Sequence, residues 1–179
     1  MKTLMLFALL ICTTVAQAMP SKIILIRHGE EPLGDEGTEL SDIGWARANS
    51  LPQLFANENI THLIALKPHK KKGSIRAIQT LQPISQTLGL TVETPYTKEE
   101  VPNFVQMLAE SPEYDGQVVL VAWQHDTLAA VAHQLGAEDA PAKWGGKNFD
   151  RYWVLEFTNG QITSFQNLPQ RLLPGDSNE

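Results

Sequence analysis

The chain contains little cysteine, and this scarcity excludes several kinds of chemistry. Its single cysteine, Cys12, lies in an N-terminal segment that we expect to be cleaved off. The remaining chain would then hold no disulfide, no thiolate nucleophile and no cysteine ligand for a metal. A nucleophile would therefore have to come from another residue type.

Long apolar runs are also absent beyond the first residues. Residues 4–15 are largely apolar, follow the positive start Met1-Lys2 and precede Ala16-Gln17-Ala18, which has the form of a cleavage site. This run is too short for a membrane-spanning helix. We therefore predict a signal peptide over residues 1–18, a mature chain over 19–179 without stable membrane insertion, and a bacterial periplasmic or secreted location.

Positive charge is scarce as well. The chain has 14 lysines and arginines against 20 acidic residues, for a net charge of −6. This balance argues against nucleic acid as a partner. A site for a phosphorylated ligand would have to be a local concentration of positive charge on an acidic body. The oligomeric state is left open.

The apolar pattern predicts one α/β domain over residues 19–179, since no repeat or long linker divides it. Strands are expected at 23–26, 61–66, 90–93, 118–122, 152–157 and 162–166, the last two forming an antiparallel hairpin. Helices are expected at 40–55 with a kink or restart at Pro52, at 75–88, around 101–108 and at 128–135. This alternation predicts a three-layer sandwich: a mostly parallel sheet of about six strands, helices on both faces and an antiparallel edge hairpin. Residues 174–179 are expected to fray.

Cationic residues recur where the predicted strands end. Arg27-His28-Gly29-Glu30 directly follows the strand at 23–26, and His125-Asp126 follows the strand at 118–122. Arg76 opens the helix that comes after a third strand. Ligands of parallel sheets collect beyond the carboxyl ends of the strands, and a glycine lets the backbone approach them closely. These residues therefore predict an anion site at one sheet edge.

Four motifs, in this order, resemble the histidine phosphatase superfamily with its phosphoglycerate-mutase-like fold: Arg27–Glu30, Leu40–Ala48, Arg76–Thr80 and Trp123–Asp126. The resemblance implies that neutral His28 attacks phosphorus and forms a phosphohistidine. The second ring nitrogen of His28 should be held by a backbone carbonyl. Arg27, Arg76 and protonated His125 would bind the phosphoryl oxygens, so that no metal and no cofactor is needed.

The general acid is left open among three carboxylates. Asp126 matches the acid of the acid-phosphatase and phytase branch, although it could also serve as a helix N-cap. Glu99 lies in the region from which the mutase branch takes its glutamate, while the pattern Thr97–Glu100 reads as a capping box. Glu30 is close to the expected phosphate site, where its expected task is to orient Arg27.

Two further features surround the expected site. The basic loop His69–Lys72 departs from the small serine-containing turn usual in the superfamily, and it is either a solvated charge run or an attractor of polyanionic substrates. An aromatic region contains Trp144, Phe149, Tyr152 and Trp153. We expect Tyr152 and Trp153 to pack in the core or on the sheet.

The sequence thus predicts a phosphatase that acts on a small phosphorylated substrate through His28. If Asp126 is only a cap, a phosphohistidine or phosphoanhydride phosphatase becomes the alternative, because such leaving groups need little protonation. A phosphate-binding protein without turnover is the remaining alternative. A mutase is disfavoured because the chain is short and carries an export signal. Sugar phosphates, lipopolysaccharide phosphates, nucleotides and inositol phosphates all fit the expected site.

Overall fold

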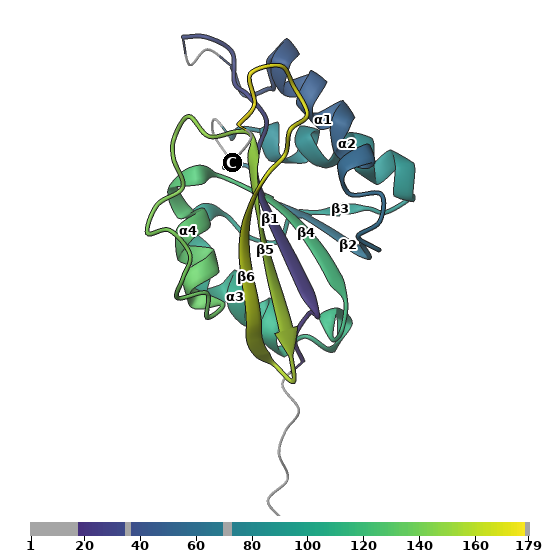
Figure 1. Cartoon of the computed structure of the whole chain (residues 1–179), viewed down its shortest axis with the longest axis vertical. Helices are drawn as coiled ribbons and strands as arrows, with labels where there is room; N and C mark the ends of the chain where they lie inside the picture. Colours follow the sequence, from purple (N-terminus) through teal and green to yellow (C-terminus); the bar gives the residue numbers. More distant parts are fainter. Residues whose placement is uncertain (1–17, 35–36, 70–72, 178–179) are drawn as a thin grey trace, which may run out of the picture.

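A six-stranded mixed sheet forms the centre of the computed structural model (Figure 1). The structure describes residues 18–34, 37–69 and 73–177, so the predicted signal peptide (apart from Ala18) and the lysines of the basic loop lie outside the described residues. The strands are β1 (Lys22–Arg27), β2 (His62–Ala65), β3 (Val92–Glu93), β4 (Val118–Trp123), β5 (Arg151–Thr158) and β6 (Gln161–Pro169).

The strand order is β3-β2-β4-β1-β5-β6. The first four strands in this order run parallel, β5 is antiparallel to β1, and β6 is antiparallel to β5. A turn at Asn159-Gly160 joins the last two strands. This arrangement confirms the predicted α/β class with an antiparallel edge hairpin.

Within the described residues, four α-helices cover the two faces of the sheet: α1 (Asp42–Leu54), α2 (Arg76–Leu88), α3 (Val101–Glu110) and α4 (His125–Gln134). Ile24 and Ile26 of β1 pack in the core shared with α1 and α2, whereas Ile23 and Leu25 pack in the core shared with α3 and α4. Successive strand residues point to opposite faces, and both faces are covered, so β1 is apolar throughout. Among the described residues, no helix is long and apolar enough to cross a membrane.

The helix ends follow the local sequence, with one correction. The side chain of Ser41 caps α1 by accepting a hydrogen bond from the Gly44 N–H at 3.1 Å, and Gly89, with φ 68°, ends α2 directly after the predicted range 75–88. The restart expected at Pro52 is not found, because α1 continues to Leu54. Proline lies in the final turn there, where its missing N–H removes only one helical hydrogen bond.

The C-terminal segment was expected to fray over residues 174–179. This prediction is wrong for residues 174–177, which the structure describes. Asp176 accepts hydrogen bonds from Arg47 at 2.8 and 3.0 Å, and also from the backbone N–H groups of Leu172 and Leu173. Arg47 belongs to α1 and is only 4% exposed. The buried guanidinium thus anchors the end of the chain to the first helix.

Candidate active site

The predicted cationic residues meet around one cavity of about 260 Å³ beyond the carboxyl ends of β1, β2 and β4. Its lining consists of Arg27, His28, Glu31, Leu66, Ser74, Arg76, Ala77, Gln124 and His125. Four of the predicted site residues, the two arginines and the two histidines, are in this set. The three carboxylates predicted as acid or orienting groups, Glu30, Glu99 and Asp126, are not in this set.

His28 is held in a neutral form with a defined tautomer. Its Nδ1–H donates to the carbonyl of Gly29 at 2.8 Å, which leaves Nε2 as the nitrogen with a free lone pair. Burial lowers the pKa of His28 to about 4, and the positive charge of Arg27 acts in the same direction. The imidazole is therefore unprotonated at neutral pH, as a nucleophile must be.

The titration of His28 can be measured directly. We expect the imidazole carbon and proton resonances that disappear in His28→Asn to titrate in the wild type with a midpoint at about pH 4. The physical reason is that protonation would place a charge in a buried site beside Arg27. The measurement is a two-dimensional NMR titration of the histidine rings between pH 3 and 8. A midpoint near the ordinary value of 6.5 would contradict this burial argument.

Arg27 brings a buried donor to the site that a ligand could use. It is 1% exposed, its Nη1 donates to the carbonyl of Gly146, and its guanidinium carbon lies 3.7 Å from the centre of the Phe149 ring. Its Nε is buried, with no hydrogen-bond partner among the described residues. A buried N–H without a partner costs free energy, which a phosphoryl oxygen would recover by accepting from it.

Glu31 is a site residue that the sequence analysis missed. Its carboxylate accepts from Arg76 Nη1 at 2.8 Å and lies 3.6 Å from Arg27 Nη2, so it stands between the two arginines. Arg76 also donates to the carbonyls of Gly37 and Glu39. Within the described residues, three of the five N–H groups of Arg76 make these bonds, and the other two are left for an anion.

Glu30 does not orient Arg27, contrary to the expectation. Its carboxylate instead accepts from Arg47 at 3.0, 3.1 and 2.7 Å. The two consecutive glutamates therefore bind different arginines. Glu31 contacts the two arginines of the cavity, whereas Glu30 binds Arg47 of α1. The run of two acidic residues after Arg27-His28-Gly29 was the available signal, but it could not say which of them faces the cavity.

His125 is the first residue of α4 and lines the cavity. Its Nδ1 is buried, with no hydrogen-bond partner in the part of the chain that the structure describes. Burial lowers the pKa of His125, and the charge of Arg27 lowers it further. A bound phosphoryl anion would offset the charge of Arg27 and so favour the protonated, donating form.

The two other predicted acids lie outside the cavity. Asp126 follows His125 in α4, but its carboxylate is bound by Lys98 at 2.8 Å and its side chain is 38% exposed. Glu99 is exposed and lines a neighbouring cavity of about 270 Å³, which also contains His69. Glu100 accepts from the backbone and hydroxyl of Thr97, which confirms the capping box.

Gly29 is required for helix packing rather than for approach to a ligand. A Cβ at this position would lie 2.9 Å from the carbonyl oxygen of Gly44 in α1. The N–H of Gly29 donates to the Thr80 hydroxyl at 2.8 Å, and Gln79 accepts in the same way from Leu40. Thr80 and Gln79, which follow Arg76 in α2, therefore hold the backbone at Gly29 and at Leu40 in place.

The aromatic region divides between core and site. Tyr152 and Trp153 pack in the two cores as expected, and Trp144 is buried against Trp153 with ring centres 4.6 Å apart. Phe149 instead covers Arg27, so it belongs to the site. Its position after the Gly145-Gly146 pair gave no periodic signal that could have identified it.

The sequence matches no family model and no curated protein, but its fold matches solved structures. The α-ribazole phosphatase of Shigella flexneri has a TM-score of 0.61 at 16% identity, covering 87% of this chain and 100% of that one. A mycobacterial glucosyl-3-phosphoglycerate phosphatase, solved with inorganic phosphate, has a TM-score of 0.55 at 18% identity, covering 82% and 95%. The fold is that of the histidine phosphatase superfamily.

A third structure with this fold is the protein histidine phosphatase SixA complexed with tungstate, with a TM-score of 0.60 at 15% identity, covering 83% of this chain and 97% of that one. Each of the three chains is matched over nearly its full length. At these identities the likeness establishes the histidine phosphatase fold, as the four sequence motifs predicted.

Proposed function

We propose that the protein is a metal-independent phosphatase that hydrolyses small phosphorylated substrates through a phosphohistidine on His28. The observation that carries the proposal is the state of His28, a neutral imidazole whose Nδ1–H is held by the Gly29 carbonyl in a cavity with two arginines. Phosphoryl transfer requires mainly positioning and neutralisation of charge, which this arrangement supplies. The phosphatases that share the fold are consistent with it.

The proposed reaction has two balanced steps. Nε2 of His28 attacks phosphorus, the bond from phosphorus to the leaving oxygen breaks, and that oxygen takes a proton from a general acid. Water then attacks the phosphohistidine, the phosphorus–nitrogen bond breaks, and the water proton returns to the conjugate base of the same acid. Arg27, Arg76 and His125 would bind the phosphoryl oxygens throughout.

Asp126 is the acid that we propose for phosphomonoesters. It lies at the first turn of α4, beside His125, where it could meet a leaving group that projects from the cavity. Its contact with Lys98, outside the cavity lining, favours a second candidate. In that candidate the substrate is a phosphohistidine or phosphoanhydride, whose leaving group needs little protonation.

One substrate panel tests the function and separates the two candidates. We expect turnover in excess EDTA, and we expect Asp126→Asn to slow hydrolysis of an alkyl phosphate by about 10²-fold or more while sparing an aryl phosphate. The difference arises because an alkoxide is a far poorer leaving group than a phenolate. The measurement is kcat/KM for an alkyl phosphate, an aryl phosphate and a phosphoramidate.

Asp139→Asn, a change at another exposed aspartate, is the matched control and should leave all three rates unchanged. A preference for the phosphoramidate with no effect of Asp126→Asn would support the second candidate. Calorimetric binding of inorganic phosphate without turnover of any substrate would refute both and favour a binding protein.

A further inference from the structure

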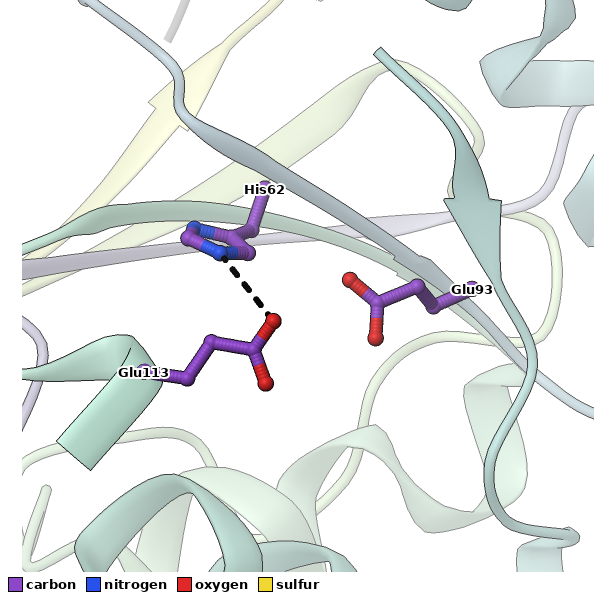
Figure 2. A group of neighbouring side chains, drawn as sticks. All are labelled: His62, Glu93 and Glu113. Carbon is purple, nitrogen blue, oxygen red and sulfur yellow. Dashed lines mark ion pairs between the residues drawn. The ribbon is translucent and has the colours of Figure 1, made fainter. Parts of the chain in front are cut away.

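Three metal-ligating side chains meet far from the phosphate cavity. His62 begins β2, Glu93 ends β3, and Glu113 lies in the short helix η2 (Pro112–Tyr114). Their ligand atoms all lie within 4.8 Å of one another, and Nε2 of His62 is 4.0 Å from Oε1 of Glu113. Figure 2 shows both carboxylates pointing toward the imidazole. The cavity of His28, by contrast, lies beyond the other end of β2, at Leu66.

The sheet register explains why these residues meet. Glu93 pairs with Ile64 of the neighbouring parallel strand, and His62 precedes Ile64 by two residues, so His62 and Glu93 share one face. Ile64 packs in the core that also contains Tyr114 of η2. The turn that carries Glu113 is therefore placed over the same face.

The Thr61 hydroxyl contacts one ring nitrogen of His62, and the other ring nitrogen faces the carboxylates. The Thr61 hydroxyl donates its only hydrogen to the Val118 carbonyl at 3.1 Å. The same hydroxyl also lies 3.1 Å from Nδ1 of His62, a contact that orients the ring. This leaves Nε2 as the nitrogen that faces the carboxylates. A metal ion between Nε2 and the carboxylates would be bound by the Nε2 lone pair and by the carboxylate oxygens.

Tyr114 holds a second member of the cluster in place. It is 2% exposed, its hydroxyl donates to Glu93 Oε2 at 3.2 Å, and its ring packs edge-on against His62 with centres 5.0 Å apart. Outer hydrogen bonds of this kind orient the ligands of metal sites in proteins. Both the imidazole and one carboxylate are thus oriented before any ion binds.

We propose that His62, Glu93 and Glu113 bind a divalent transition-metal ion, with Zn²⁺ as the best fit. Imidazole and carboxylate are both ligand types that zinc accepts, and water would take the fourth position. Bonds of about 2.0–2.2 Å require ligand atoms roughly 3.3 Å apart, so the His62–Glu113 pair, now at 4.0 Å, must close by about 0.7 Å and any pair at the 4.8 Å limit by about 1.5 Å. Glu113 can supply this movement because its side chain is 62% exposed.

The ion would act on stability and leave the phosphatase reaction alone. The edge strand β3 has only two residues, and the ion would join it to β2 and to η2. Binding to the folded state alone raises stability. We therefore expect Zn²⁺ at 100 times its Kd to raise the Tm of the metal-free protein by about 5–10 °C.

The test is calorimetric titration of the metal-free full chain with Zn²⁺, together with thermal unfolding. We expect one site per chain, weakened at least tenfold in His62→Asn and in Glu113→Gln. Glu113 is exposed, so Glu113→Gln keeps the test valid even if His62→Asn fails to fold. The matched controls His133→Asn and Glu138→Gln, at exposed positions of the same residue types, should bind like the wild type.

Two results would overturn the proposal. One is the absence of Zn²⁺ binding to the wild type at micromolar concentrations. The other is binding that survives in both cluster variants but is lost in His28→Asn, which would place the ion in the phosphate cavity. Neither result depends on whether the phosphatase proposal is correct.

Discussion

Replacement of His28 by alanine is expected to lower kcat by about 10⁴-fold or more, because the variant lacks the proposed nucleophile. His28→Asn should be equally inactive while keeping an amide that can donate to Gly29. The measurement is phosphate release from an aryl phosphate, together with rapid acid-free denaturation after incubation with a ³²P-labelled substrate. The wild type should retain label that is stable in base and lost in acid.

His133 provides the control for this experiment, since it is an exposed histidine on α4. His133→Ala should keep wild-type turnover and wild-type labelling. If either His28 variant kept more than a tenth of the activity, or if the label were found on His125, the proposed mechanism would be refuted. Phosphate binding measured by calorimetry separates loss of chemistry from loss of the folded cavity.

Arg47→Met should cause the largest loss of stability, about 3–5 kcal/mol, or a decrease in Tm of about 6–20 °C. The guanidinium is 4% exposed and binds the carboxylates of Glu30 and Asp176 and the amide oxygen of Gln170. Methionine fills much of the same volume but leaves two carboxylates without their partner in a poorly solvated site. Thermal and urea unfolding at pH 7 measure the effect.

Acid should reduce the difference between Arg47→Met and the wild type. Burial raises the pKa of Asp176, but hydrogen bonds from Arg47, Leu173 and Leu172 outweigh it and hold the pKa at about 2, below its ordinary 3.8. A carboxyl whose pKa is lowered by folding stabilises the protein above its unfolded pKa, and this contribution is lost as the pH falls through the folded pKa. The difference should therefore shrink between about pH 4 and pH 2.

Arg151→Met is the matched control, because in the described structure the Arg151 side chain donates exposed hydrogen bonds to Asn167 within the β5–β6 hairpin. It should change stability by about 0.5 kcal/mol or less. An equal loss of stability in the two variants would contradict the role assigned to the buried guanidinium of Arg47.

The gathering of the cationic site residues at one sheet edge was predictable from the sequence. Apolar runs at 23–26 and 118–122 predict parallel strands, and the carboxyl ends of parallel strands lie at one sheet edge. Residues directly after such strands, such as His28 and His125, must then come close together. The placement of Arg76 at the start of α2 follows from the same rule.

The partners of the acidic residues near the site were not predictable in this way. Glu30 and Glu31 are adjacent and chemically identical in type, yet one binds Arg47 and the other stands between the cavity arginines. The direction in which each side chain leaves the loop is determined by packing against α1, where Gly29 and Gly44 touch. No pattern along the chain contains that information.

The sequence by itself determined the succession of strands and helices along the chain, the two-sided core and the motifs at the strand ends. These features depend on apolar periodicity and on residues near one another in the chain. Only the tertiary structure decided the partners of the charged groups. Arg27 meets the carbonyl of Gly146 across 119 positions, and Arg47 meets Asp176 across 129. Such contacts depend on how separate elements pack, and so do the anchored C-terminal segment and the cluster at His62.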